Sequence, residues 1–322
     1  MSIDKSQDLY NQVQSAYRAK FLQLQKQLEK EFKKIAGEFD GKIQRLVFQY
    51  SKPDGNFDKK YLADINREID AIADWFTKTN AQWINNNIVQ SVEFAIDSQD
   101  MAARAFAQAA AEEYQGKGRE ILTKAATDPA APFLLRAQFG TGLAGHIRKA
   151  VWKRRWVDGW TLSDRIWETD RVLRKNLHDM IEQCVNEGLS AVEFSRAVEQ
   201  YLLKPGPAWT TKITPSKTGR GSIKYNALRL ARTETNNAYR TAHALGAKNS
   251  TIVKGIKWNL SHSHPEPDIC DEWATQNLYG LGPGVYPPDK LSPGHPQCLC
   301  YLTDQLYTGQ ELINRLKEKY KT

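Results

Sequence analysis

The chain has few cysteines and no long apolar run, and each absence excludes a class of protein. Four cysteines in 322 residues are too few for a disulfide-stabilised framework, so we expect a reducing compartment. No run of about 18 apolar residues occurs, and the first ten residues lack the basic and apolar regions of a secretion signal. We therefore expect no membrane partner. Apolar residues still make up 41% of the chain, which is enough to fill the core of a folded protein.

The first two thirds of the chain are helical by periodicity. Apolar residues recur every three or four positions from Val13 to Phe39, which gives one apolar face that must pack against a partner helix in the same chain or in a neighbour. The same spacing predicts a helix over 62–88. The alanine-rich segment 101–115 favours a further helix that ends near Gly116, and cap candidates predict helices within 160–203.

The composition changes after residue 203. Residues 204–224 concentrate Pro, Gly, Thr and Lys without a period, which is typical of a linker or an exposed loop. We therefore predict a helical assembly or partner-binding region over 1–203 and a small module over 225–322. In this module, residues 225–248 favour a helix and 252–258 alternate like a strand. The predicted fold class is mainly α, with a small α+β module at the C-terminus.

Three of the four cysteines lie in or at the end of an irregular stretch, residues 261–300, which is rich in Pro, Gly, His and Asp. A loop of this length needs a ligand or a function to hold its shape. We predict a structural zinc site, because zinc binds Cys and His and supplies the folding energy that such a loop lacks. The expected ligands are Cys270, His295, Cys298 and Cys300, with His264, Asp268 and His262 as alternates. The other interpretation is buried thiols and surface histidines around a proline turn.

One helix face within 225–248 carries polar side chains at helical spacing. Its members are Arg232, Glu234, Asn236, Arg240 and His243. Such a face can meet a phosphate, a carboxylate or the acidic loop that follows it, and it can equally be solvated.

Basic residues gather in two places. Residues 206–257 carry ten Lys and Arg against one acidic residue, whereas 258–304 carry one Lys against six acidic residues. Lys153, Arg154 and Arg155 lie between two tryptophans, a pattern that can contact the phosphates of nucleic acid with neighbouring rings for stacking. The alternative is a basic helix face in a protein interface.

Four segments together resemble the C-terminal domain of the bacteriophage Mu F-like head-morphogenesis, or minor head protein, family. They are Ala231–Thr235, Gly255–Trp258, Ser263–Asp271 and Pro293–Cys300, and their order and spacing match over about residues 225–303. Many members carry Cys-x-x-Cys where this chain has Cys270 followed by Asp271, Glu272 and Trp273. This departure raises His264 and Asp268 as substitute ligands.

The resemblance implies a minor component of a tailed-phage head, made in the cytoplasm of the bacterial host and held inside the capsid near the portal. Such a protein assists head assembly and genome packaging or delivery. The partners implied are portal and capsid proteins and packaged double-stranded DNA.

The alternative function is a metal-dependent enzyme, either a nuclease or deaminase-like, that is packaged with the genome. His264 and Glu266 with the later cysteines are superficially similar to a zinc deaminase pattern, but Cys298 and Cys300 form Cys-x-Cys where deaminases have Cys-x-x-Cys. The sequence also lacks a P-loop, a G-x-S-x-G elbow and a Rossmann fingerprint. We therefore expect an assembly role rather than catalysis.

Overall fold

The computed structural model describes residues 4–128, 134–136, 140–156, 158–203, 222–262 and 267–320. The structure is 75% helical, with a small three-stranded antiparallel sheet near the C-terminus, which confirms the predicted fold class. None of the helices in these ranges is long and apolar enough to cross a bilayer.

The chain forms two compact units, and each is assembled from separate segments. The first unit takes residues 1–24, 87–151 and 233–322, and the second takes 25–86 and 152–232. Long helices contribute residues to both units, so this division does not follow the sequential order that we predicted. Residues 204–221 of the predicted linker lie outside the described residues, and 223–224 already belong to a helix.

Two long helices open the chain. Helix α1 spans Asp4–Tyr50 and, after the short 3-10 helix η1 (Lys59–Tyr61), α2 spans Leu62–Glu113. Helix α2 joins the two helices predicted over 62–88 and 101–115, because no Gly or Pro interrupts the residues between them. It ends just before Gly116, whose φ of 57° suits glycine.

The second unit is held by an aromatic core. Phe32 and Phe39 of α1 are fully buried, and each packs edge-to-face against Phe76 of α2. This part of the apolar stripe of α1 is therefore covered by the chain itself. Helices α6 (Leu162–Glu187) and α7 (Ala191–Leu203) complete the unit, and they pack against each other. Thr161 caps α6 and Ser190 caps α7, and both helices lie within 160–203, where helices were predicted.

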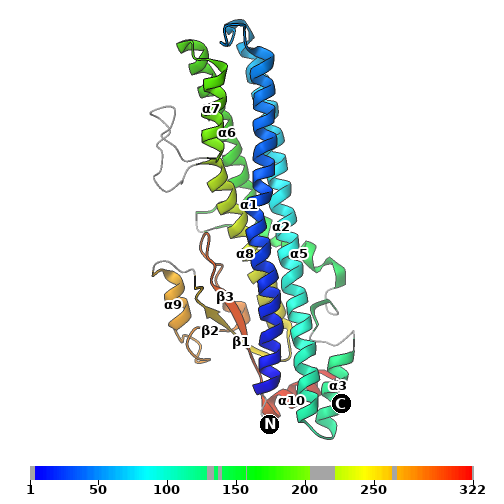
Figure 1. Cartoon of the computed structure of the whole chain (residues 1–322). Coiled ribbons are helices and arrows are strands. Elements are labelled where there is room, and N and C mark those ends of the chain that lie inside the picture. Colours follow the sequence, from blue (N-terminus) through cyan, green and yellow to red (C-terminus); the bar gives the residue numbers. More distant parts are fainter. Residues whose placement is uncertain are drawn as a thin grey trace. The chain divides into compact units, whose positions relative to one another are not determined.

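The first unit combines helices with the sheet. Its helices are α3 (Lys117–Thr127), α5 (Leu143–Lys153), most of α8 (Ile223–Asn249) and α10 (Gly309–Tyr320), with the 3-10 helix η2 (Gly140–Gly142) before α5. Helix α10 packs against α3, as Figure 1 shows, through a cluster that includes Ile121, Leu122 and Leu312. Our sequence analysis did not predict α10.

The sheet has β1 (Val253–Asn259) at its centre, between β2 (Val285–Tyr286) and β3 (Tyr301–Leu306) (Figure 1). Both neighbours run antiparallel to β1. The predicted strand over 252–258 is thus confirmed as β1, whereas β3 was not predicted. The stretch expected to be irregular contains short elements: α9 (Ile269–Thr275), β2 and the 3-10 helix η3 (Pro288–Lys290).

Candidate metal centre

Two short segments of the first unit bring the cysteines together. Asp268 caps α9 by accepting a hydrogen bond from the backbone N–H of Cys270 at 2.7 Å, and this places the Cys270 side chain in the first turn of the helix. The second segment turns back on itself, because the N–H of Cys298 donates to the carbonyl of His295 at 3.2 Å. Gln297 adopts a left-handed φ of 59° within this turn.

The turn and α9 form a cluster of metal-binding atoms. One donor atom each from Cys270, His295 and Cys298 lies within 4.8 Å of the other two. The sulfurs of Cys270 and Cys298 are 3.5 Å apart, close to the separation of about 3.8 Å expected for two thiolates on one tetrahedral zinc ion. Cys300 lies near this cluster, but its sulfur is not one of the three grouped donors, so its role as a ligand stays a prediction. The cluster can therefore hold a metal ion, as the sequence predicted.

His295 presents a ring nitrogen to this cluster. Its Nδ1 lies 2.9 Å from the carbonyl oxygen of Pro296, so that a proton on Nδ1 leaves the Nε2 lone pair for a metal. Nε2 is buried and makes no hydrogen bond among the residues that the structure describes. It lies 3.0 Å from a carboxylate oxygen of Asp268. A metal ion would bind this nitrogen in place of that ion pair. Asp268 is not one of the three grouped donors, so its role as an alternate ligand stays a prediction.

The thiols differ in acidity because they are buried together. Hydrogen bonds from Cys270 and Cys300 lower the pKa of the Cys298 thiol, and the guanidinium of Arg240 lowers it further. Hydrogen bonds to Cys298 and Cys300 raise the pKa of Cys270. Cys184 lies in the second unit, and burial is the main cause that raises the pKa of its thiol to about 12. Cys298 is thus the thiol most readily converted to the thiolate that binds metals.

The predicted polar face of α8 holds the turn in place. Asn236 donates from its side chain to the carbonyl of Cys298. Arg240 donates to the Cys298 sulfur at 3.0 Å and to the carbonyl of Cys300, and its guanidinium lies over the ring of Trp258. Both side chains are more than nine-tenths buried, so this face meets the cysteine segment instead of solvent.

Two further residues of α8 make the same connection, and our sequence analysis did not select them. Thr233 accepts a hydrogen bond from the N–H of Gln297 at 3.0 Å, and Asn237 bonds both backbone groups of Gly294. A side chain on Gly294 would collide with Arg240, so glycine is required where the turn meets the helix. The signal was present in the sequence, since Thr233 and Asn237 share the helical spacing of Asn236 and Arg240.

Next to the turn, a buried carboxylate gathers four side chains. One oxygen of Asp304 accepts from Tyr10 at 2.6 Å, Gln14 at 2.8 Å and Gln99 at 3.0 Å, and the other lies 2.8 Å from Nε2 of His243. Burial raises the pKa of Asp304, but the charge and hydrogen bond of His243 and the other hydrogen bonds outweigh burial, so the pKa lies below its ordinary value. Burial and the negative charge of Asp304 raise the pKa of Tyr10.

Of the remaining predicted residues, Arg232 and Glu234 lie in α8, and His262 follows β1. Arg232 approaches Glu29 of α1 at 4.0 Å in the second unit, and Glu234 is completely buried. His262 is exposed, and His264 lies outside the described residues.

The basic triplet lies at the end of α5 and just after it. Lys153 is exposed, the guanidinium of Arg154 lies over the ring of Trp156, and Arg155 donates to the carbonyl of Gly159 at 2.8 Å. The stacking partner that we predicted for a nucleic-acid base is therefore already in contact with an arginine of the chain. Contact with nucleic acid stays a prediction.

We compared the chain with protein-family models, with curated proteins and with solved structures, and none of the three comparisons finds a match.

Proposed function

We propose that this chain is a minor head protein of a tailed phage, associated with the portal inside the capsid, where it assists head assembly and genome packaging or delivery. One observation carries the proposal: the segments that resemble the Mu F-like family pack together as one cluster. Thr233 of the first segment bonds the cysteine turn, as does Asn236 just after that segment, and Trp258 of the second shares a buried cluster with Cys270 and Cys298. Residues 263–266 lie outside the described part.

These contacts support a structural module rather than a reaction chamber. Cys270 is 0% exposed and Cys298 is 3% exposed, so an ion held between them has little access for a substrate. A catalytic zinc ion needs an open coordination position, whereas a structural ion is enclosed by its ligands. We therefore propose a structural zinc ion, bound by Cys270, His295 and Cys298, with Cys300 as the fourth ligand and Asp268 as its alternate.

The proposed partners are the portal and capsid proteins and the packaged double-stranded DNA. A formal net charge of +8 supports a location beside DNA, because basic surfaces attract polyanions. Lys153 and Arg155 are exposed and are the side chains of the basic triplet best placed to reach phosphates.

The test is the fate of the chain in phage particles. DNA-filled heads are purified from a lysate of the host that carries the gene, and the chain is quantified by mass spectrometry after chemical cross-linking. We expect a few copies per head and cross-links to the portal protein. Deletion of the gene should reduce the yield of infectious particles by at least about tenfold, and a plasmid copy should restore it.

Two controls separate this result from contamination. Nuclease and protease treatment of the intact heads should leave the chain undigested, because the capsid encloses it. A chain that stays in the soluble host fraction, together with a full particle yield after deletion, would contradict the proposal.

A further inference from the structure

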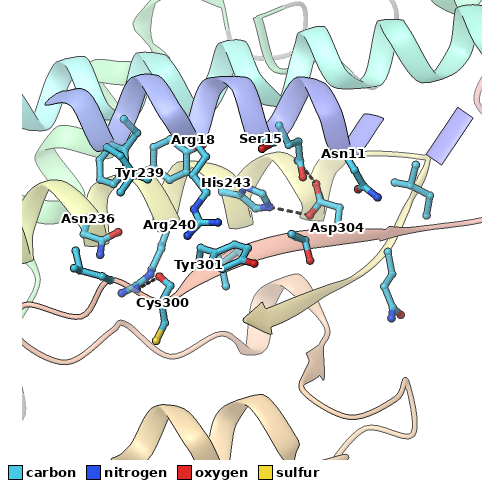
Figure 2. A pocket seen from close by; sticks show the side chains of 18 of the residues that line it. Asn11, Ser15, Arg18, Asn236, Tyr239, Arg240, His243, Cys300, Tyr301 and Asp304 are labelled. Atoms are coloured by element: carbon cyan, nitrogen blue, oxygen red, sulfur yellow. Dashed lines mark hydrogen bonds and ion pairs between the residues drawn. The ribbon is translucent and has the colours of Figure 1, made fainter. Parts of the chain in front are cut away.

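A groove of about 670 Å³ lies within the first unit, and Figure 2 shows side chains that line it, Cys300 among them. One wall is a stripe of α1 that runs from Gln7 to Leu22, and another is β3 with the two residues before it, Leu299–Leu306. Both walls are about 22 Å long, at 1.5 Å per helical residue and 3.3 Å per strand residue. The groove therefore follows the whole length of the strand, with α8 residues also lining it.

β3 presents a free edge. The N–H of Trp258 in β1 donates to the carbonyl of Gly284, toward the β2 side, at 2.8 Å. In the ladder between β1 and β3, Trp258 lies opposite Leu302, and Ile256 lies opposite Asp304. Because the N–H of Trp258 points toward β2, both of these pairs are non-hydrogen-bonded pairs of the β1–β3 ladder. The backbone N–H and C=O groups of Leu302 and Asp304 point away from β1, and they have no hydrogen-bond partner among the described residues.

Two buried side chains in the groove have unsatisfied polar atoms. Gln14 is 7% exposed and Arg240 is 6% exposed, and both line the groove. Within the described ranges, neither Oε1 of Gln14 nor Nε of Arg240 has a hydrogen-bond partner. One needs a donor and the other an acceptor, and leaving such atoms unpaired is costly.

The charge of the groove selects the kind of peptide. Three cationic side chains line it, from Arg18, Arg240 and Lys254; Arg240 already donates to Cys298 and Cys300, so Arg18 and Lys254 are the two available to a ligand. The one acidic side chain in the lining, Asp304, is already held by His243 and three other donors. Arg18 lies flat on the ring of Tyr301, 3.2 Å from its centroid, which leaves the guanidinium edge for a carboxylate (Figure 2).

We propose that this groove binds an extended, acidic segment of a partner protein, which adds a strand to the free edge of β3. Strand addition supplies affinity through main-chain hydrogen bonds and specificity through the side chains that alternate along the added strand. A nucleic acid fits less well, because phosphates offer no donor to the carbonyl groups of the β3 edge and a face of the Tyr301 ring is covered by Arg18. The groove borders the metal cluster, since Cys300 and Arg240 line it, but the inference needs neither a bound ion nor the phage assignment.

The test measures binding of short labelled peptides to the full chain by fluorescence anisotropy. The probe is an eight-residue peptide of alternating Val and Glu, capped at both ends. One comparison peptide has Lys in place of Glu, and another has N-methyl groups on alternate amides, which removes the donors along one edge. We expect saturable binding of the probe, and at least tenfold weaker binding of both comparison peptides.

Variants of the protein locate the site. Arg18→Glu and Lys254→Glu should each weaken binding of the probe at least tenfold. Lys26→Glu makes the same charge change on an exposed position of α1 outside the groove, and should leave the affinity within twofold. Amide hydrogen exchange across 301–306 should slow when the probe binds.

Several outcomes would overturn the inference. They are no binding of the probe at millimolar concentration, equal binding of the N-methylated peptide, and displacement of the probe by a thymidine oligonucleotide but not by unlabelled peptide. Concentration-dependent self-association that buries 301–306 in the absence of peptide would also overturn it, since a second copy would then occupy the edge. The N-methylated peptide tests the contact on unaltered protein, so the conclusion does not depend on a variant that folds poorly.

Discussion

Single residues decide how firmly β3 is tied to the helices, and Asp304 matters most. It is buried, and its two oxygens contact Tyr10, Gln14, Gln99 and His243. In Asp304→Asn, one oxygen becomes an NH₂ group that cannot accept these hydrogen bonds, and the charge that faces His243 is lost. We expect the free energy of unfolding of the first unit to fall by about 3 kcal/mol at pH 7, measured by urea denaturation.

The pH dependence of Asp304→Asn follows from the direction of its pKa shift. The pKa of Asp304 is lower in the folded chain than its ordinary value, so its stabilising contribution is complete above the unfolded pKa and is lost as the pH falls through the folded pKa. The difference between wild type and Asp304→Asn should therefore shrink at acidic pH. Asp289→Asn, at an exposed position of the same unit, should change stability by less than about 0.5 kcal/mol at either pH. A constant difference between wild type and Asp304→Asn at all pH values would contradict this account.

Among single residues, the sequence predicted the members of the metal cluster but not the side chains that surround Asp304. Cys270, His295 and Cys298 could be selected because their chemistry and the short spacing of the last two residues are visible in the sequence. Asp304 could not, because two of its partners, Tyr10 and Gln99, are 294 and 205 positions away. Only the folded chain brings these side chains together.

At the scale of elements, periodicity and caps predicted the helices and missed the elements without a strong pattern. Helices α6 and α7 were found because a Thr or Ser cap precedes an acidic residue by three positions. Strand β3 was missed because it is short and its inward-facing position 304 is an acid, which breaks the apolar alternation. The Gly and Pro residues between α9 and β2 predicted irregular structure there, but not where each turn lies.

The connection between α9 and β2 depends on glycine, and two glycines there separate backbone conformation from packing. Gly280 and Gly284 have φ values of 67° and 70°. A Cβ on Gly280 would meet nothing within 4 Å, whereas a Cβ on Gly284 would collide with the backbone of Ala274 in α9. Gly280→Ala should cost about 1 kcal/mol of unfolding free energy, from backbone strain alone.

Gly284→Ala should cost about 3 kcal/mol, because steric collision adds to the strain. Urea denaturation of both variants, followed by near-ultraviolet circular dichroism of the tryptophans, measures the difference. The same loss for the two variants would mean that the close approach of α9 to Gly284 does not constrain the fold.

At the scale of the whole molecule, the sequence did not predict which segments form each of the two compact units. Helices α1, α2 and α8 each contribute residues to both units, and no change in composition marks the borders at residues 24, 86 and 232. Periodicity shows that a helix is amphipathic, but it does not show which distant helix covers each turn. For this reason the linker predicted from composition does not coincide with a border between compact units.

The proposed zinc ion links the residue and molecular scales, because all of its candidate ligands belong to the first unit. Purified full-length protein should contain about one zinc ion per chain by elemental analysis. Removal of the ion with a chelator should accelerate amide hydrogen exchange over 268–306 at least about tenfold, since a bound ion stabilises only the states that keep the site intact. Exchange over 162–203, in the second unit, should stay within about twofold.

Cys298→Ser should reproduce the chelated state without a chelator, because it removes the thiol with the lowered pKa. Cys184→Ser is the matched control, since Cys184 is equally buried but lies in the second unit. It should leave the zinc content unchanged, while any faster exchange should be confined to 162–203. Accelerated exchange in both units after chelation would show that they unfold together, and a full zinc content in Cys298→Ser would remove Cys298 from the ligand set. These outcomes are distinct because Cys184 is the one cysteine of the second unit, whereas the other three cysteines belong to the first unit.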